Sequence, residues 1–149
     1  MSGYAAIGLD NPQYDVNVGG VLRAADCYGA VMVAVGGSRF KRQRTDTTKA
    51  WRRIPIVVGD DVMALVPFDA VPVAVDLVAD AIPLHAYQHP KRAFYVFGPE
   101  NGTLGKRVLD RCRDRIFIPM NGCSNLAATA NVVLYDRAAK ELLRKQEAA

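Results

Sequence analysis

The sequence predicts an α/β fold in which a parallel sheet is flanked by helices. Short apolar runs alternate with segments of helical periodicity along the chain, a pattern typical of parallel sheets. The runs at residues 31–35 and 71–75 contain no polar side chain, as expected of strands that are covered on both faces. The chain has 149 residues and no linker that would divide it, so we expect a single domain over residues 1–149.

The first half of the chain is expected to begin with a strand and a helix. Residues 4–9 are apolar and read as the first strand. Asn17 is a preferred N-cap residue, so we expect a helix over residues 18–28 that ends at Gly29. The apolar residues of this helix recur at helical spacing and predict one buried face. The elements expected next are strands at 31–35 and 56–58 and a short helix from Asp60-Asp61.

The second half of the chain continues the alternation and ends in a long helix. This helix is expected from residue 126 to about residue 145, with Ser124 or Asn125 as its N-cap. One side of it carries an apolar stripe longer than a terminal helix on a small sheet needs, which predicts a homodimer. The stripe consists of Leu126, Ala130, Val133, Leu134, Ala138 and Leu142. The other elements expected here are strands at 71–75, 93–97 and 115–118 and a helix at 105–112.

Basic residues concentrate in one segment. The chain carries 19 Lys and Arg residues against 15 Asp and Glu residues, a net charge of +4. Between residues 39 and 53 only Asp46 opposes the basic residues, and Phe40 and Trp51 are interleaved with them. Such a segment can neutralise phosphates and stack on bases; the alternative is a solvated loop whose arginine stems cover the core. The candidate nucleic-acid-binding residues are Arg39, Lys41, Arg42, Arg44, Arg52 and Arg53.

Membrane, secreted and metal-binding proteins are not expected. No apolar run reaches the roughly 18 residues of a membrane-spanning helix, and the N-terminus lacks the features of a signal peptide. The three cysteines include no C-x-x-C pair, so we expect neither disulfides nor zinc and place the protein in the reducing cytoplasm. His85 and His89 are four residues apart, but no acidic residue lies between them. We therefore expect no metal site, and both histidines to lie in loops or at the surface.

Three segments carry the functional information. Residues 17–25 read NVGGVLRAA, residues 97–104 read FGPENGTL and residues 118–126 read IPMNGCSNL. Each lies beside an expected strand end or helix start, and ligands bind at the carboxyl ends of strands in open α/β sheets. In this order and spacing the segments resemble the three motifs of the SpoU/TrmH family of RNA ribose 2′-O-methyltransferases, which belong to the SPOUT class. The resemblance spans roughly residues 4–141.

The resemblance implies a cofactor, a substrate and a more specific fold. The cofactor is S-adenosylmethionine, and the substrate is a ribose 2′-hydroxyl of tRNA, with rRNA as the alternative. The fold is a SPOUT-type homodimer in which the last helix is threaded through a C-terminal trefoil knot. Methyl transfer from a sulfonium to a hydroxyl needs no metal and depends largely on positioning. The implied cofactor-binding residues are Val75, Phe97, Gly98, Ile118, Met120, Cys123, Ser124 and Leu126.

Four residues match the catalytic positions of the family. The motif arginine, here Arg23, is proposed to act as a base or to orient ribose and phosphate; we favour positioning, because arginine stays protonated near neutral pH. Glu100 is expected to pair with the Arg23 guanidinium. Asn125 is expected to brace Arg23 or Glu100, and Asn17 to fix the loop beside Arg23 as well as to cap the helix.

One departure from the family pattern leaves an alternative open. Cys123 stands where the family usually has serine, and Ser124 is the other candidate to supply a hydroxyl. This change is the only support for a catalytically inactive SPOUT-fold RNA-binding protein, a hypothesis that the intact Arg23, Glu100 and Asn125 oppose. A generic doubly wound nucleotide-binding enzyme ranks last, because the chain has neither G-x-G-x-x-G after its first strand nor a P-loop.

Overall fold

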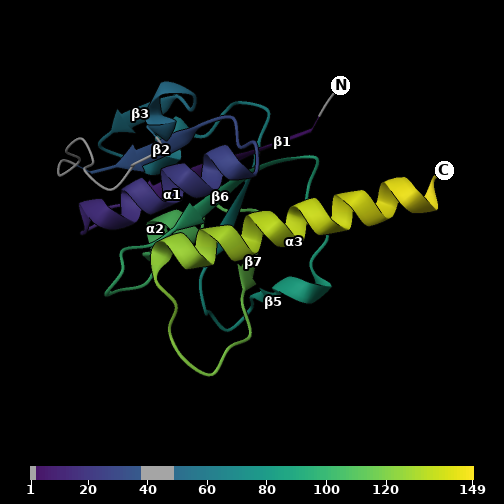
Figure 1. The fold of residues 1–149 in the computed structure, drawn as a ribbon. Coiled ribbons are helices and arrows are strands. Elements are labelled where there is room, and N and C mark those ends of the chain that lie inside the picture. The colour runs from purple at the N-terminus through teal and green to yellow at the C-terminus, as the bar shows by residue number, and fades with distance from the viewer. Residues whose placement is uncertain (1–2, 38–48) are drawn as a thin grey trace.

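The computed structural model describes residues 3–37 and 49–149, which form one parallel sheet with helices on both faces (Figure 1). The sheet has seven strands in the order β3-β2-β1-β6-β4-β7-β5, and all neighbouring pairs are parallel. This arrangement confirms the predicted α/β class. The strands are β1 (Tyr4–Asp10), β2 (Val33–Gly36), β3 (Ile56–Gly59), β4 (Val71–Val75), β5 (Ile82–Pro83), β6 (Arg92–Phe97) and β7 (Asp114–Phe117). The helices are α1 (Asp15–Cys27), α2 (Lys106–Leu109) and α3 (Leu126–Glu147), with 3-10 turns η1 (Ala50–Arg52), η2 (Val62–Leu65) and η3 (Leu84–Ala86).

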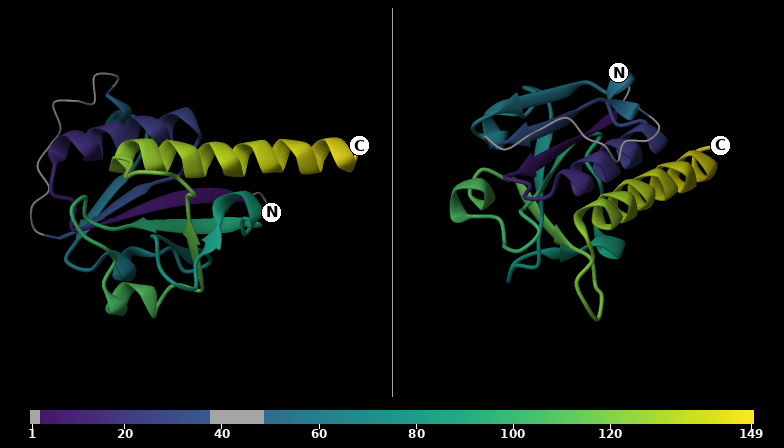
Figure 2. Two further views of the ribbon diagram at one scale, coloured as in Figure 1. Left: turned by 90° about the horizontal axis from the view of Figure 1, so that it is seen from below. Right: turned by 60° about the vertical axis from the view of Figure 1, so that its left-hand side comes forward.

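The sheet separates two hydrophobic cores. Helices α1 and α3 lie side by side over one face, and α2 lies with η2 over the other (Figure 2). Because side chains alternate along a strand, β6 supplies both cores. Tyr95 enters the core beneath α1 and α3, whereas Phe94 and Val96 enter the opposite core. Among the described residues, no helix has the length and hydrophobicity needed to cross a membrane.

Helix α1 starts earlier than the sequence predicts. Its first residue is Asp15, and its N-cap, Tyr14, makes no side-chain capping bond. The prediction that Asn17 caps this helix is wrong, because the Asn17 amide instead donates to Glu100 across a loop. The C-terminal end agrees with the prediction. Gly29 has a φ of +68°, a left-handed conformation that glycine adopts without steric cost and that commonly ends helices.

Helix α3 uses one of its two candidate caps and buries much of its apolar stripe. Asn125 is the N-cap, and its side chain accepts a hydrogen bond of 2.8 Å from the backbone N–H of Ala128. The buried residues of the stripe pack within the chain, whereas Leu142 is 61% exposed. Packing within the chain accounts for the buried part of the stripe, and the homodimer stays a prediction. The buried members are Leu126, Ala130, Val133 and Leu134.

Short elements account for the other differences. The helix expected from Asp60-Asp61 is the 3-10 turn η2, capped by Asp61, which accepts from the N–H of Met63 at 3.0 Å. The helix expected over residues 105–112 is regular only in α2, and η1, β5 and η3 were not predicted. These elements have two to four residues, which is too short for hydrophobic periodicity to detect.

A glycine lets α1 and α3 approach closely. A Cβ atom added at Gly20 would lie 2.7 Å from the Cβ of Ala127, well inside van der Waals contact. Ala127 follows the first residue of α3, so this contact sets where α3 begins relative to α1. Small residues on both helices are therefore required at the crossing.

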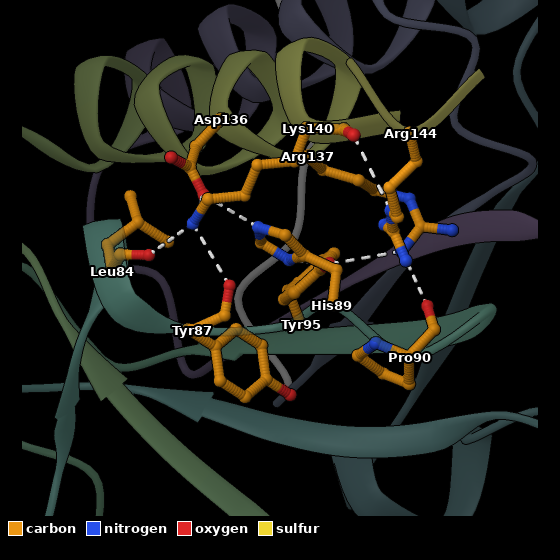
Figure 3. A network of polar contacts seen from close by, with 9 residues as sticks. All are labelled: Leu84, Tyr87, His89, Pro90, Tyr95, Asp136, Arg137, Lys140 and Arg144. Carbon is orange, nitrogen blue, oxygen red and sulfur yellow. Dashed lines mark hydrogen bonds and ion pairs between the residues drawn. The ribbon is translucent and has the colours of Figure 1, made fainter. Parts of the chain in front are cut away.

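The middle of α3 is fixed to β6 and η3 by a buried polar network (Figure 3). His89 lies in a loop, as predicted, but its side chain is fully buried and not at the surface. Its Nδ1 lies 2.6 Å from the Tyr95 hydroxyl, and its Nε2 lies 2.7 Å from Asp136. Lys140 donates to the carbonyl of Leu84 at 2.6 Å and pairs with Asp136 at 2.7 Å.

Every donor in this network has an acceptor when His89 is neutral. Arg137 donates to the Tyr95 oxygen at 3.3 Å, which leaves the Tyr95 O–H to donate to Nδ1 of His89 and Nε2–H to donate to Asp136. Burial lowers the pKa of His89, and the hydrogen bond to Asp136 opposes the shift only in part. In the neutral ring, Nδ1 accepts the hydrogen bond from the Tyr95 hydroxyl. Protonation would make Nδ1 a donor that faces another donor, so the network favours the neutral ring.

We expect the stability of the fold to decrease as pH falls below about 6.5, the ordinary pKa of histidine. The folded pKa is lowered, so below that pH the unfolded chain binds a proton that the folded chain does not, and the folded state loses stability until its own pKa is reached. Urea unfolding between pH 5 and pH 8 measures this. His89→Gln should remove this part of the pH dependence, and His85→Gln, at an exposed position, should keep it.

The α1–α3 crossing gives a second expectation. Gly20→Ala should lower the free energy of unfolding by about 1–2 kcal/mol, because overpacking against the rigid Ala127 outweighs the gain in helix propensity. Gly105→Ala is the matched control, since an added Cβ there meets nothing within 4 Å. Urea unfolding of both variants should separate them, and equal stability would contradict the importance of the close approach.

Candidate functional site

A cavity lies at the carboxyl ends of β4, β6 and β7, where the loop before α3 covers this edge of the sheet. Its volume is about 960 Å³, at the upper end of the range for small-molecule sites. Much of its wall belongs to the second and third of the three segments singled out in the sequence. All eight predicted cofactor-binding residues line it, namely Val75, Phe97, Gly98, Ile118, Met120, Cys123, Ser124 and Leu126.

Glu100 ties the second segment to the start of the first. Its carboxylate accepts hydrogen bonds from the backbone N–H of Gln13 at 2.9 Å, from the N–H of Tyr14 at 3.3 Å and from the Asn17 amide at 2.9 Å. Partial burial raises the pKa of Glu100, but the bonds from Gln13, Asn17 and Tyr14 outweigh it, so the pKa lies below its ordinary value. Glu100 is therefore an ionised brace that holds the loop before α1 against the cavity.

Asp76 performs the same task at the other end of the loop between β6 and α2. One carboxylate oxygen accepts from the N–H of Leu77 and the other from the N–H of Leu104, both at 2.8 Å. Gly98 allows this tight loop, because an added Cβ would lie 3.1 Å from the Leu104 nitrogen. Sequence reasoning missed Asp76, although a carboxylate directly after a buried strand was a signal that could have identified it.

The expected contacts of Arg23 and Asn125 are not formed. Within residues 3–37 and 49–149, no ion pair joins Arg23 to Glu100, whose oxygens already accept three hydrogen bonds. Arg23 is exposed on α1 and does not line the cavity. Asn125 does line it, but its side-chain oxygen caps α3 rather than bracing Arg23 or Glu100. Asn17 lines the cavity as well, through its bond to Glu100.

The predicted RNA-binding residues are described only in part. Arg39, Lys41, Arg42 and Arg44 lie outside the described residues. The guanidinium carbon of Arg52 lies 5.2 Å from the centroid of the Trp51 ring, within the range of a cation–π contact. Arg53 forms an ion pair with Asp26 of α1, so its guanidinium already has a partner within the chain.

Cysteine and metal chemistry find little support in the described part of the chain. There, no group of three or more His, Cys, Asp or Glu residues could hold a metal ion. Cys27, Cys112 and Cys123 are free. Burial raises the pKa of Cys112 to about 11, which keeps that thiol protonated, whereas Cys123 is exposed at the cavity wall.

The cavity has an acidic character. Asp76 and Glu100 line it, and among the described residues that line it none is basic. Its floor is apolar, because Val75, Phe97 and Leu126 are buried beneath it. An apolar floor suits a planar aromatic group, and two carboxylates favour a positively charged ligand over an anionic nucleotide.

Comparison with known proteins identifies a family. A model of the SpoU rRNA Methylase family matches residues 4–135, which is most of the chain. No curated protein matches the chain in a sequence comparison. The matched range covers all three of the segments singled out in the sequence and ends within α3.

Solved structures share this fold. AviRb, a SpoU methyltransferase from Streptomyces viridochromogenes solved with AdoMet, has a TM-score of 0.85 and 22% identity over 95% of this chain and 62% of that one. The A. aeolicus TrmH/SpoU tRNA modifying enzyme has a TM-score of 0.84 and 19% identity over 97% and 79%. A structure that gives insights into the 2-OH methylation of C/U34 on tRNA has a TM-score of 0.78 and 22% identity over 95% and 93%. The chain thus spans about three fifths of the length of AviRb.

The bracing role of Glu100 can be tested without any ligand. Glu100→Ala should increase hydrogen exchange at the amides of Gln13 and Tyr14 by about tenfold, because each loses its hydrogen-bond acceptor. The Leu104 amide is the internal control, since it donates to Asp76 and should exchange as before. Amide exchange followed by NMR reads all three positions, and unchanged protection at Gln13 and Tyr14 would show that other contacts hold this loop.

Proposed function

We propose that this chain, which belongs to the SpoU rRNA methylase family, transfers a methyl group from S-adenosylmethionine to a ribose 2′-hydroxyl of RNA. The observation that carries the proposal is the cavity at the carboxyl ends of β4, β6 and β7. The second and third motif segments form much of its wall, and a hydrogen bond from Asn17 to Glu100 joins the first segment to the second. The match of the family model over residues 4–135 supports the reaction class.

The cavity fits the cofactor by its chemistry. Val75, Phe97 and Leu126 supply an apolar surface for the adenine, and the backbone of residues 118–126 offers polar groups to its edge. Asp76 and Glu100 give the site a charge that suits a sulfonium and an ammonium group. AviRb, which shares the fold, was solved with AdoMet. When bound, the cofactor supplies an activated methyl group, and the chain contributes binding, orientation and exclusion of water.

Arg23 acts on the RNA rather than on the cofactor. It is exposed on α1 and does not line the cavity, and an arginine keeps its proton near neutral pH. Its guanidinium would hold a phosphate or the ribose and stabilise negative charge as the hydroxyl attacks, which is electrostatic stabilisation of the transition state. Glu100, Asn17 and Asn125 fix the loops around the cavity through the bonds already described.

The RNA substrate is proposed to be a tRNA. Two structures with this fold are described as acting on tRNA, and one of them matches this chain over 93% of its own length, so it has little room for further domains. The family's description names rRNA, which remains the second candidate. The basic segment of residues 39–53 would contact the RNA backbone, and its described members include the exposed Arg52, which lies within cation–π range of Trp51.

We further propose a homodimer, a trefoil knot and a cytoplasmic single-domain protein. Exposed apolar side chains on α1 and α3, among them Val16, Val132 and Tyr135, support self-association. The knot is supported by strand order: β7 lies between β4 and β5, which follow one another in sequence, so the connection at residues 76–81 crosses the path of β7. One continuous sheet and free cysteines are consistent with one cytoplasmic domain.

Arg23→Ala should reduce methyl transfer by about 100-fold or more, the usual effect of removing a group that stabilises charge in the transition state. The affinity for S-adenosylmethionine, measured by calorimetry with a chelator present, should stay nearly the same because Arg23 lies outside the cavity. Transfer of labelled methyl groups to tRNA and to rRNA, followed by nucleoside analysis, measures activity and identifies the RNA.

Arg52→Ala is the contrasting variant for this experiment. It should weaken RNA binding and flatten its salt dependence, because phosphate contacts release counterions, while the rate at saturating RNA stays similar. Normal turnover by Arg23→Ala would reject the catalytic role. Cofactor and RNA binding without any transfer by the wild-type chain would support the inactive RNA-binding alternative.

A further inference from the structure

Arg53 forms a bidentate ion pair with Asp26 of α1. Its Nε lies 3.0 Å and 3.1 Å from the two carboxylate oxygens of Asp26, and its terminal nitrogen lies 2.5 Å from one of them. Both oxygens of Asp26 therefore accept from the same guanidinium, the strongest geometry for an arginine–carboxylate pair. The hydrogen bond from Arg53 is also the main cause that lowers the pKa of Asp26.

Asp26 occupies a position from which it could pair with Arg23. The two residues are three apart on α1, and side chains three or four residues apart on a helix are surface neighbours that commonly form ion pairs. No such pair forms. Among the described residues, the Asp26 carboxylate pairs with Arg53 and not with Arg23, and Arg53 is the only arginine that contributes to the pKa shift of Asp26.

We propose that Arg53 is a positioning residue that occupies Asp26 and thereby keeps the Arg23 guanidinium available for RNA. The catalytic part of this inference rests on the proposed function. The competition of Arg53 and Arg23 for the Asp26 carboxylate does not depend on it. The sequence predicts Arg53 as an RNA contact, whereas this proposal assigns it a contact within the chain. Arg53 follows η1, so the pair also fastens the end of the basic segment to the helix that carries Arg23.

The first test measures the availability of Arg23 without RNA or cofactor. Phenylglyoxal modifies free guanidinium groups, and peptide mass spectrometry gives the labelling rate at Arg23, with the distant, exposed Arg144 as internal reference. In Arg53→Ala, Asp26 is released and pairs with Arg23, so labelling of Arg23 should slow by about two- to fivefold, the range expected of an exposed ion pair. The double variant Arg53→Ala with Asp26→Asn should restore the wild-type rate.

Two outcomes of this test would overturn the proposal. One is an unchanged labelling rate at Arg23 in Arg53→Ala. The other is a slower rate that Asp26→Asn does not restore, which would mean that loss of Arg53 acts through some other change. Arg53→Lys is an intermediate check, because a lysine keeps the charge but not the two-pronged geometry, so its labelling rate should fall between those of the wild type and Arg53→Ala. Raising the salt concentration should reduce the effect.

The second test measures methyl transfer at saturating RNA. Arg53→Ala should lower the maximal rate by about two- to fivefold, and the added Asp26→Asn should restore it. If Arg53 were only a phosphate contact, the substitution would instead raise the RNA concentration needed for half-maximal rate, and Asp26→Asn would not correct it. Failure of the wild-type chain to transfer methyl groups would reject the proposed function and leave the labelling result intact, so the two failures are distinguishable.

Discussion

The close packing of α3 on α1 and the sheet is the constraint on which the site depends. Helix α3 follows the loop that covers the cavity, so its placement determines where that loop can go. At its start, Gly20 allows the backbone of α1 to approach Ala127. In its middle, the network around His89 fixes Asp136 to β6 and η3 (Figure 3). Two independent contacts along one rigid helix leave little freedom for the loop at its N-terminus.

Carboxylates brace the other walls of the cavity by accepting backbone N–H groups. Glu100 fastens the loop before α1, and Asp76 fastens the end of the loop after β6. This use of Glu100 differs from the arginine partner that the motif resemblance implies, and it leaves Arg23 directed to solvent. The same residue types thus sit at the expected positions, but the carboxylate serves the architecture of the loops and the guanidinium is left for a ligand outside the cavity.

The sequence predicted those features that follow from long apolar runs and from motif matches. It placed β1, β4, β6 and α3 within a few residues of their observed bounds, and the strands were recognisable because buried parallel strands are continuously apolar. The motif matches identified residues that line the cavity. It misplaced the start of α1, since Asn17 is both a good cap and a good amide donor and only the fold brings Glu100 to it. Burial of His89 was equally hidden, because its partners Tyr95 and Asp136 are distant in sequence.

The arrangement of charge separates the two proposed ligands. Asp76 and Glu100 make the cavity attractive to a cationic cofactor and repulsive to phosphate, whereas Arg23 and Arg52 are exposed outside it. On the proposed function, the RNA backbone therefore stays over α1, and an uncharged ribose hydroxyl is the part that approaches the cavity. An unpaired Asp26 would disturb this arrangement, because it would place a carboxylate beside the arginine that holds the RNA. Its pairing with Arg53 removes that competition, so the separation of charge extends from the cavity to the surface of α1.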